Sequence, residues 1–269
     1  MENKMTDNRS SEKKRLFVVI LLTTGLALLG IASYFFLDER VVAWLVQNPS
    51  YFKKTLLIKA VVQLGKVWLP VWLLLCWALL AGRRQETMIA LIALFLLVFS
   101  LQPLKVITQR PRPRDVIEHS EVNDKPEIFH NCSFPSGDTA SVFAVAVAIS
   151  PFIGWFAGSI VFVLAVCVGA LRVVSFAHYP SDVFAGAAIG VLSGYLAYYL
   201  FMSVPFLKIN LVKLLSFRNV LLGVIIIPAV VVLFGGLNNF LVFLEFYPPI
   251  VIVLYLLYKI RKPQKPEIP

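Results

Sequence analysis

Long runs of apolar residues without a charge restrict the possible folds of this chain more than any other feature. The first extends from Leu16 to Leu37, and about 20 such residues cross the roughly 30 Å of bilayer hydrocarbon as a helix. Inside a bilayer every backbone polar group needs a partner, so uninterrupted apolar runs predict α-helices. Because 59% of the residues are hydrophobic and only 15% are charged, an ordinary soluble domain is excluded.

The runs predict an all-α, polytopic transmembrane helical bundle with eight spans. Six form a core over residues 16–204, and two more follow over 205–258. The spans are expected at 16–37, 60–82, 86–104, 138–155, 158–176, 182–204, 219–235 and 240–258. Six or seven spans are the alternatives. Lys59 and Lys66 interrupt the second run, where residues 41–66 suit the membrane interface, and two prolines interrupt the last.

The positions of Lys and Arg orient the bundle. Basic clusters lie in the tail of residues 1–15, between the second and third spans, after the sixth span, and in the tail of residues 259–269. With eight spans all four clusters fall on one side, which the positive-inside rule makes cytoplasmic. The net charge of +10 suits this orientation and anionic head groups, so no nucleic-acid partner is expected.

Three polar segments lie at the ends of apolar runs on the opposite side. They comprise residues 105–113, 132–140 and 172–182. The first begins a loop that is basic although the topology rule disfavours basic residues there. Binding of a phosphate group is one reason for such an exception. Three distant polar segments at one membrane depth therefore predict a site.

The residue types in these segments suit a phosphate monoester, whose oxygens need cations and N–H donors. Lys105, Arg112 and Arg172 supply positive charge. Ser136 and Gly137 come just before a predicted helix, whose free N–H groups and dipole attract anions.

A nucleophile is also present. His178 lies four residues before Asp182, so one helical turn brings the carboxylate onto one ring nitrogen. The other nitrogen is then free to attack phosphorus and form a phosphohistidine. No metal-ligand spacing is present, so we expect no metal and no cofactor.

The spacing of these residues resembles the three-part signature of the type 2 phosphatidate phosphatase superfamily. The parts are Lys105-x6-Arg112-Pro113, Pro135-Ser136-Gly137 and Arg172-x5-His178-x3-Asp182. The resemblance covers roughly residues 60–204 and implies a helical bundle with six core spans. It also implies that His178 is the nucleophile, that Asp182 orients it, and that Lys105, Arg112 and Arg172 hold the phosphate.

Two positions depart from the signature. The family usually has Ser where this chain has Leu171, and a His that protonates the leaving alcohol where this chain has Asp138. An aspartic acid donates a proton only if it stays protonated, and nearby Arg and Lys oppose that. Either Asp138 is protonated when the substrate phosphate arrives, or another group donates; His119 and His130 are the candidates. Asp138 could also be an N-cap only, and Arg110 and Arg114 could bind head groups or be merely solvated.

The form Cys132-Ser-Phe-x-x-Gly-Asp138, together with Arg110-Pro-Arg-Pro, is similar to bacterial lipid A phosphatases, especially those that act at the 4′ position. This resemblance implies a phosphatase for the 4′ or 1 position in the bacterial inner membrane, with the site facing the periplasm. The alternatives are an undecaprenyl pyrophosphate or phosphatidylglycerophosphate phosphatase, a lipid phosphotransferase, and an inactive lipid-binding or transport relative.

Overall fold

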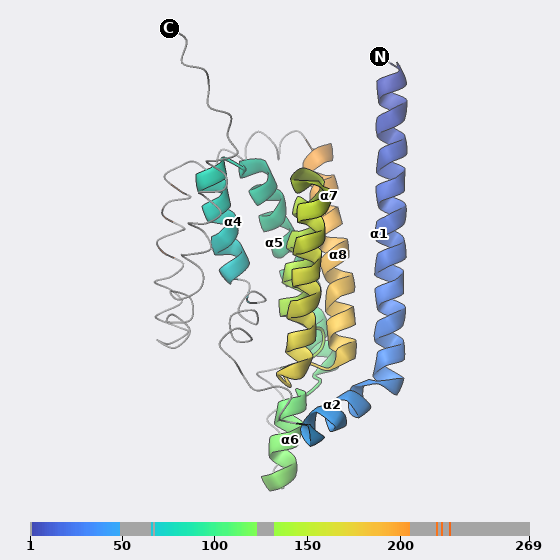
Figure 1. Cartoon of the computed structure of the whole chain (residues 1–269), viewed down its shortest axis with the longest axis vertical. Helices are drawn as coiled ribbons and strands as arrows, with labels where there is room; N and C mark the ends of the chain where they lie inside the picture. The colour runs from blue at the N-terminus through green and yellow to red at the C-terminus, as the bar shows by residue number, and fades with distance from the viewer. Residues whose placement is uncertain are drawn as a thin grey trace.

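The computed structural model describes residues 2–48, 66, 68–122 and 132–204, together with Asn219, Leu222 and Ile226. The regular secondary structure of these residues is helical and includes no strand, which confirms the all-α prediction. The helices are α1 (Glu2–Phe36), α2 (Asp38–Gln47), α4 (Trp68–Ala81), α5 (Arg84–Thr108), α6 (Pro113–Val122), α7 (Gly137–Val174) and α8 (Pro180–Ser203) (Figure 1). The two spans predicted over 205–258 and the tail of residues 259–269 lie outside the described residues, apart from three isolated positions.

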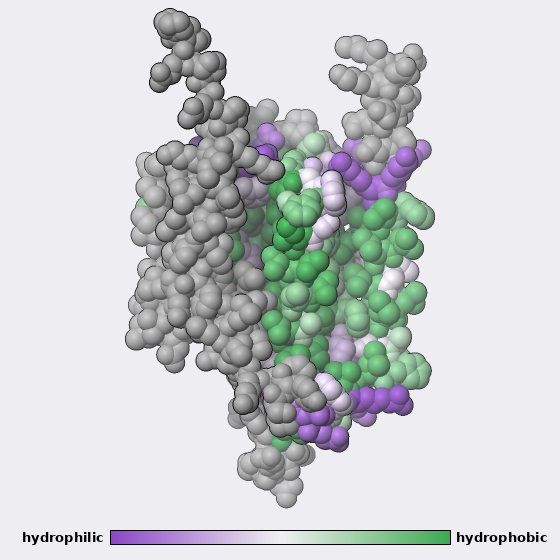
Figure 2. All heavy atoms as spheres, viewed as in Figure 1, coloured by the Kyte–Doolittle hydropathy of each residue, from purple (hydrophilic) through white to green (hydrophobic). Residues whose placement is uncertain are grey.

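Four of the described helices, α1, α5, α7 and α8, are long and apolar enough to cross a membrane. The apolar part of α4 is shorter and covers Leu69–Ala78. Figure 2 shows hydrophobic surface along α1 between hydrophilic zones at its two ends, as expected for a helix in lipid. The six-span core and the total of eight spans stay predictions. The basic residues predicted as a tail over 1–15 form the polar first turns of α1.

Helix α7 folds back on itself at Gly154. This residue has φ 79° and ψ 164°, which no α-helix accommodates, and a glycine adopts a positive φ without a steric cost. Straight, its 38 residues would extend about 57 Å, yet Asp138 near its start forms an ion pair with Arg172 near its end. The two legs, 137–153 and 155–174, correspond to the two spans predicted at 138–155 and 158–176.

Small residues bring the first leg of α7 against α8. Three glycines at four-residue spacing on α8, Gly186, Gly190 and Gly194, face the backbone of α7. A Cβ atom at Gly186 would overlap the carbonyl oxygen of Ser136, and one at Gly190 would overlap that of Ala140. Glycine at these positions therefore lets the two backbones approach closely, as in other membrane helix pairs.

Helix α8 lies at the centre of the bundle and packs against α1, α5 and α7. Its first turn lies at the same end as α2, α6 and the end of α5, which is the end opposite the N-terminus of α1 (Figure 1). The sequence predicted neither α2 nor α6 as a helix. Together these elements bring the three polar segments to one end of the molecule.

Candidate active site

Backbone hydrogen bonds join the three polar segments to one another. The Ser133 amide donates to the Arg110 carbonyl at 2.7 Å and so joins the first segment to the second. The Ser136 amide donates to the Asp182 carbonyl at 3.0 Å, between the second and the third. The amide of Arg114, the residue directly after the first segment, donates to the Phe176 carbonyl of the third segment at 3.1 Å. Main-chain hydrogen bonds therefore hold together the three polar segments, whose convergence the sequence predicted.

The spacing of the third segment has a local cause. After α7 ends, the chain turns back so that the amides of Ala177 and His178 both donate to the carbonyl of Arg172. Helix α8 then begins at Pro180, which suits a first helical position because it lacks an N–H group. Asp182 accepts from the Tyr179 amide at 2.8 Å, so its carboxylate caps the helix that follows His178.

The His178 ring is buried, with 2% of its surface exposed, and its orientation is set by a carbonyl group. Nδ1 lies 2.8 Å from the carbonyl oxygen of Ser133. A carbonyl oxygen only accepts hydrogen bonds, so Nδ1 carries the hydrogen and Nε2 carries the lone pair. This is the tautomer that a nucleophilic Nε2 requires.

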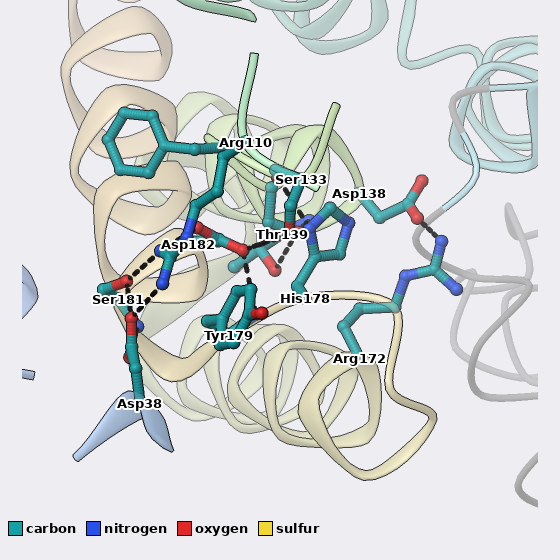
Figure 3. A network of polar contacts seen from close by, with 12 residues as sticks. Asp38, Arg110, Ser133, Asp138, Thr139, Arg172, His178, Tyr179, Ser181 and Asp182 are labelled. Atoms are coloured by element: carbon teal, nitrogen blue, oxygen red, sulfur yellow. Dashed lines mark hydrogen bonds and ion pairs between the residues drawn. The ribbon is translucent and has the colours of Figure 1, made fainter. Parts of the chain in front are cut away.

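The carboxylate of Asp182 does not contact the ring in the way the sequence predicted. Its Oδ2 atom lies 3.8 Å from His178 Nδ1, too far for a hydrogen bond. Instead Oδ2 accepts short hydrogen bonds from the Ser133 hydroxyl and the Tyr179 amide, while Oδ1 accepts from Arg110 at 2.8 Å. Asp182 therefore reaches His178 through Ser133, whose hydroxyl meets the carboxylate and whose carbonyl meets the ring (Figure 3).

The surroundings of His178 keep the ring neutral. Burial lowers its pKa below the ordinary value, and the positive charges of Arg112 and Arg172 lower the pKa further. The negative charge of Asp182 acts in the opposite direction without outweighing burial. A neutral ring with a free Nε2 lone pair is thus the resting state near pH 7.

Two of the cations predicted to hold phosphate, Arg112 and Arg172, act electrostatically on this ring. Lys105 lies in the last turn of α5, and Arg112 lies between α5 and α6; both are half-buried and interact electrostatically with Asp182. Arg172 is 9% exposed, and its Nε atom is buried without a hydrogen-bond partner among the described residues. Lys66, assigned from the sequence to the membrane interface, also interacts with Arg172. The pKa of Lys66 is lowered mainly by burial and further by the positive charge of Arg172.

Ser136 and Gly137 lie at the start of α7, as predicted. Ser136 is the N-cap, and its hydroxyl accepts from the Thr139 amide at 3.4 Å. The N-cap alternative considered for Asp138 is therefore wrong, because Asp138 lies inside the first turn. The Ser136 amide donates to the Asp182 carbonyl and the Thr139 amide to the Ser136 hydroxyl, so the amides of Gly137 and Asp138 are the ones that this turn offers to an anion.

Asp138 pairs with Arg172. Its carboxylate contacts the guanidinium group directly, and both side chains are mostly buried. Figure 3 shows this pair on one side of His178, with the Asp182 cluster on the other. Asp138, which stands where the signature has its acid, is therefore paired with Arg172, one of the cations predicted to hold phosphate.

Several candidates fall elsewhere. His130 lies outside the described residues, and His119 is described only as part of the α6 backbone. Arg110 contacts Asp38 and Asp182 instead of facing solvent, and Arg114 pairs with Asp115. Within the described ranges no three His, Cys, Asp or Glu side chains are grouped to hold a metal ion.

The family model of the PAP2 superfamily matches residues 86–205, which include all three polar segments. Among solved structures, the crystal structure of Aquifex aeolicus LpxE matches with 28% identity and a TM-score of 0.46. That match covers 53% of this chain and 84% of the other. No curated protein matches the sequence significantly.

Proposed function

We propose that this chain, whose residues 86–205 match the PAP2 superfamily, is a membrane lipid phosphatase that works through a phosphohistidine at His178. Its substrate is a lipid phosphomonoester, for which lipid A, at the 4′ or the 1 position, is the leading choice. This choice rests on the resemblance of residues 132–138 to bacterial lipid A phosphatases.

The observation that carries the proposal is the tautomer of His178. With Nδ1–H held by the Ser133 carbonyl, Nε2 has its lone pair free in a site that contains Lys105, Arg112 and Arg172. Such a group is a nucleophile beside an anion-binding site, which suits attack on phosphorus.

In the first step Nε2 of His178 attacks phosphorus, and the bond from phosphorus to the lipid oxygen breaks. The bonding electrons leave with that oxygen, which must take up a proton. The cations and the N–H groups at the start of α7 stabilise the charge on the non-bridging oxygens. In the second step water attacks phosphorus, the P–N bond breaks, and inorganic phosphate leaves while Nε2 recovers its lone pair.

Asp138 is our candidate for the proton donor. In the resting site its carboxylate is paired with Arg172. A substrate phosphate competes for the same guanidinium group and displaces the carboxylate, and the phosphate charge then favours the protonated acid beside it. After donation, the carboxylate accepts a proton from the attacking water.

The site is proposed to face the periplasm. It lies at the end of the bundle opposite the basic N-terminus of α1, whose Lys13, Lys14 and Arg15 are exposed. Intact spheroplasts that carry the protein should therefore release phosphate from p-nitrophenyl phosphate added outside. Release that appears only after permeabilisation would reverse the orientation.

The test of function is phosphate release by the detergent-purified protein in the presence of EDTA. The lipids are lipid A, undecaprenyl pyrophosphate, phosphatidylglycerophosphate and phosphatidate, each with wild type and His178→Ala. Release from lipid A that is lost in His178→Ala supports the proposal, and the phosphate left on the product identifies the position. An acid-labile, alkali-stable phosphate on the wild-type protein during turnover identifies the phosphohistidine.

Other outcomes select the alternatives. Release from another lipid keeps the mechanism and discards lipid A. Activity that requires EDTA to be left out contradicts the expected metal independence. Phosphate transfer only to an added acceptor lipid indicates a phosphotransferase. No release and no transfer with any lipid indicates an inactive lipid-binding or transport relative.

A further inference from the structure

A buried acidic residue outside the three polar segments reaches the candidate site. Asp38, in the first turn of α2, is 2% exposed although it lies more than 60 residues before the first segment. Its carboxylate accepts from the Ser181 amide at 2.9 Å, the Ser181 hydroxyl, and Ser33 at 3.1 Å. These donors satisfy the buried carboxylate, and they join the α1–α2 corner to the start of α8.

Arg110 connects this carboxylate to the one beside His178. Its Nη2 lies 2.7 Å from Asp38, and its Nη1 lies 2.8 Å from Asp182. Nη1 also donates to the Ser181 hydroxyl at 2.7 Å. The guanidinium plane lies 3.8 Å from the centre of the Tyr179 ring. Figure 3 shows Asp38, Arg110 and Asp182 in one connected chain.

We propose that Asp38 and Arg110 are positioning residues that set the charge and the place of Asp182, and through Ser133 those of His178. This inference rests on the proposed function of His178 as nucleophile. It gives the α1–α2 corner a role in catalysis as well as in anchoring. It also makes the carboxylates of Asp38 and Asp182, instead of the substrate phosphate, the partners of Arg110.

The net charge of Asp38, Arg110 and Asp182 determines how this cluster acts on His178. Two carboxylates and one guanidinium form a cluster with one net negative charge, which offsets part of the positive field around the ring. When Nε2 is phosphorylated and Nδ1 keeps its hydrogen, the ring gains positive charge, and this cluster stabilises that charge. Without Asp38, Arg110 neutralises Asp182 alone, and the stabilisation decreases.

Among the described residues, the charged groups that act on His178 are Asp182 from α8, Arg172 from the end of α7 and Arg112 from the first segment. Behind them, Lys105 and Arg110 interact with Asp182, Asp38 pairs with Arg110, and Asp138 pairs with Arg172. Tyr179 lies next to the ring in sequence. Only two of these charges belong to the proposed pair, and they have opposite signs. Removing them one at a time therefore gives opposite effects on the ring.

The experiment compares wild type with Asp38→Asn, Arg110→Gln and Ser181→Ala. Asp115→Asn is the matched control, because it removes an equal charge from a pair on α6. Asp38→Asn should lower kcat/KM about tenfold or more, in line with other groups that orient a reacting residue. Its acid limb should move down by about half a pH unit, whereas that of Arg110→Gln should move up. Ser181→Ala keeps every charge, so it should lower kcat severalfold without moving the limb.

A purely structural role would lower the amount of folded protein without moving the limb in opposite directions. Wild-type kcat/KM and an unmoved acid limb in Asp38→Asn would overturn the proposal. If Arg110→Gln does not fold, an unchanged kcat in Ser181→Ala overturns it equally.

A measurement that needs no enzymatic turnover tests the roles of Asp38 and Arg110 independently of the proposed phosphatase activity. The titration midpoint of His178, assigned by NMR from the signal missing in His178→Ala, should move down in Asp38→Asn and stay in Asp115→Asn. If wild type releases phosphate from no lipid, the proposed function fails, and this midpoint still decides the inference. An unmoved midpoint in Asp38→Asn contradicts it.

Discussion

The Nδ1 atom of His178 donates to the carbonyl oxygen of Ser133 at 2.8 Å, although the two residues are 45 positions apart in the chain. The nearest oxygen of Asp182, four residues away, is 3.8 Å from the same atom. The ring is therefore oriented by a loop in front of α7, while the carboxylate acts on the ring by its charge and also holds the Ser133 hydroxyl.

This relay predicts that Ser133→Ala slows catalysis without abolishing it. The substitution keeps the carbonyl that accepts from Nδ1 but removes a hydrogen bond to a buried carboxylate, which is worth about 1.5–3 kcal/mol. We expect kcat to fall about tenfold to a hundredfold with little change in KM. Ser159→Ala, at an exposed position in the second leg of α7, is the control. Wild-type kcat in Ser133→Ala would assign the orientation of the ring to the backbone alone.

The lowered pKa of His178 predicts how activity depends on pH. Because the ring must be neutral to attack, kcat/KM should hold at pH 6.5, the ordinary midpoint of histidine, and decline only as the pH falls through the lower folded pKa. A phosphate monoester itself titrates near pH 6, so the profile should be measured with two substrates whose phosphates titrate differently. An acid limb that follows the substrate would contradict the assignment to His178.

The stability of the folded protein should depend on pH in the same direction as activity, and decrease as the pH falls. The folded pKa of His178 lies below that of the unfolded chain, so the neutral buried ring contributes its full stability above about pH 6.5. That contribution is lost as the pH falls toward and through the folded pKa. Thermal unfolding of wild type and His178→Asn in detergent should therefore converge at acidic pH. A difference in Tm that widens on acidification would reverse the sign of the shift.

The pairing of Asp138 with Arg172 predicts a dependence on the leaving group. Asp138→Asn removes the proposed acid, so release from an alkyl phosphate should fall about 10² to 10⁴-fold. Release from p-nitrophenyl phosphate should change much less, because its leaving group needs no proton. Asp138→His restores the usual residue of the superfamily and should keep alkyl phosphate activity. An equal loss on both substrates in Asp138→Asn would make Asp138 a binding residue instead of the acid.

The contact of α8 with α7 predicts unequal effects of one substitution at two glycines. Gly190→Ala places a methyl group against the Ala140 carbonyl and should destabilise the fold by about 1–3 kcal/mol. Gly25→Ala, on α1, meets nothing within 4 Å and should be neutral or stabilising by up to about 1 kcal/mol. Thermal unfolding of the two variants in one detergent compares them directly. Equal Tm values would show that the α7–α8 contact tolerates a methyl group.

The sequence predicted the long apolar helices, but not α2 and α6, and it predicted the convergence of the three segments, because both features have side-chain signatures. Apolar length predicts spans, and the fold-back at Gly154 agrees with two predicted spans that the helix assignment merges into α7. The spacing from Arg172 to His178 was also informative, since a turn that closes on the last carbonyls of a helix has a fixed length.

The parts that were missed have no such signature. Ser133 acts on the ring through its carbonyl, which every residue possesses, so no residue type marks it. Asp38 appears in the sequence as one of two adjacent acids, Asp38 and Glu39, after an apolar run, and only the packing of α2 beside α8 brings it to Arg110. The predicted bond from Asp182 to the ring was wrong for a related reason: helical spacing gives the direction of a side chain but not the competitors for its oxygens.

The glycine contact between α7 and α8 also limits how this site can change. Along this seam the two helices are spaced by main-chain atoms, since a Cβ atom at Gly186 would overlap the Ser136 carbonyl. The Ser136 amide in turn donates to the Asp182 carbonyl at 3.0 Å, so the start of α7 and the start of α8 are held at a fixed separation. Any residue larger than glycine at this position would therefore move the segment of Ser136 away from that of His178.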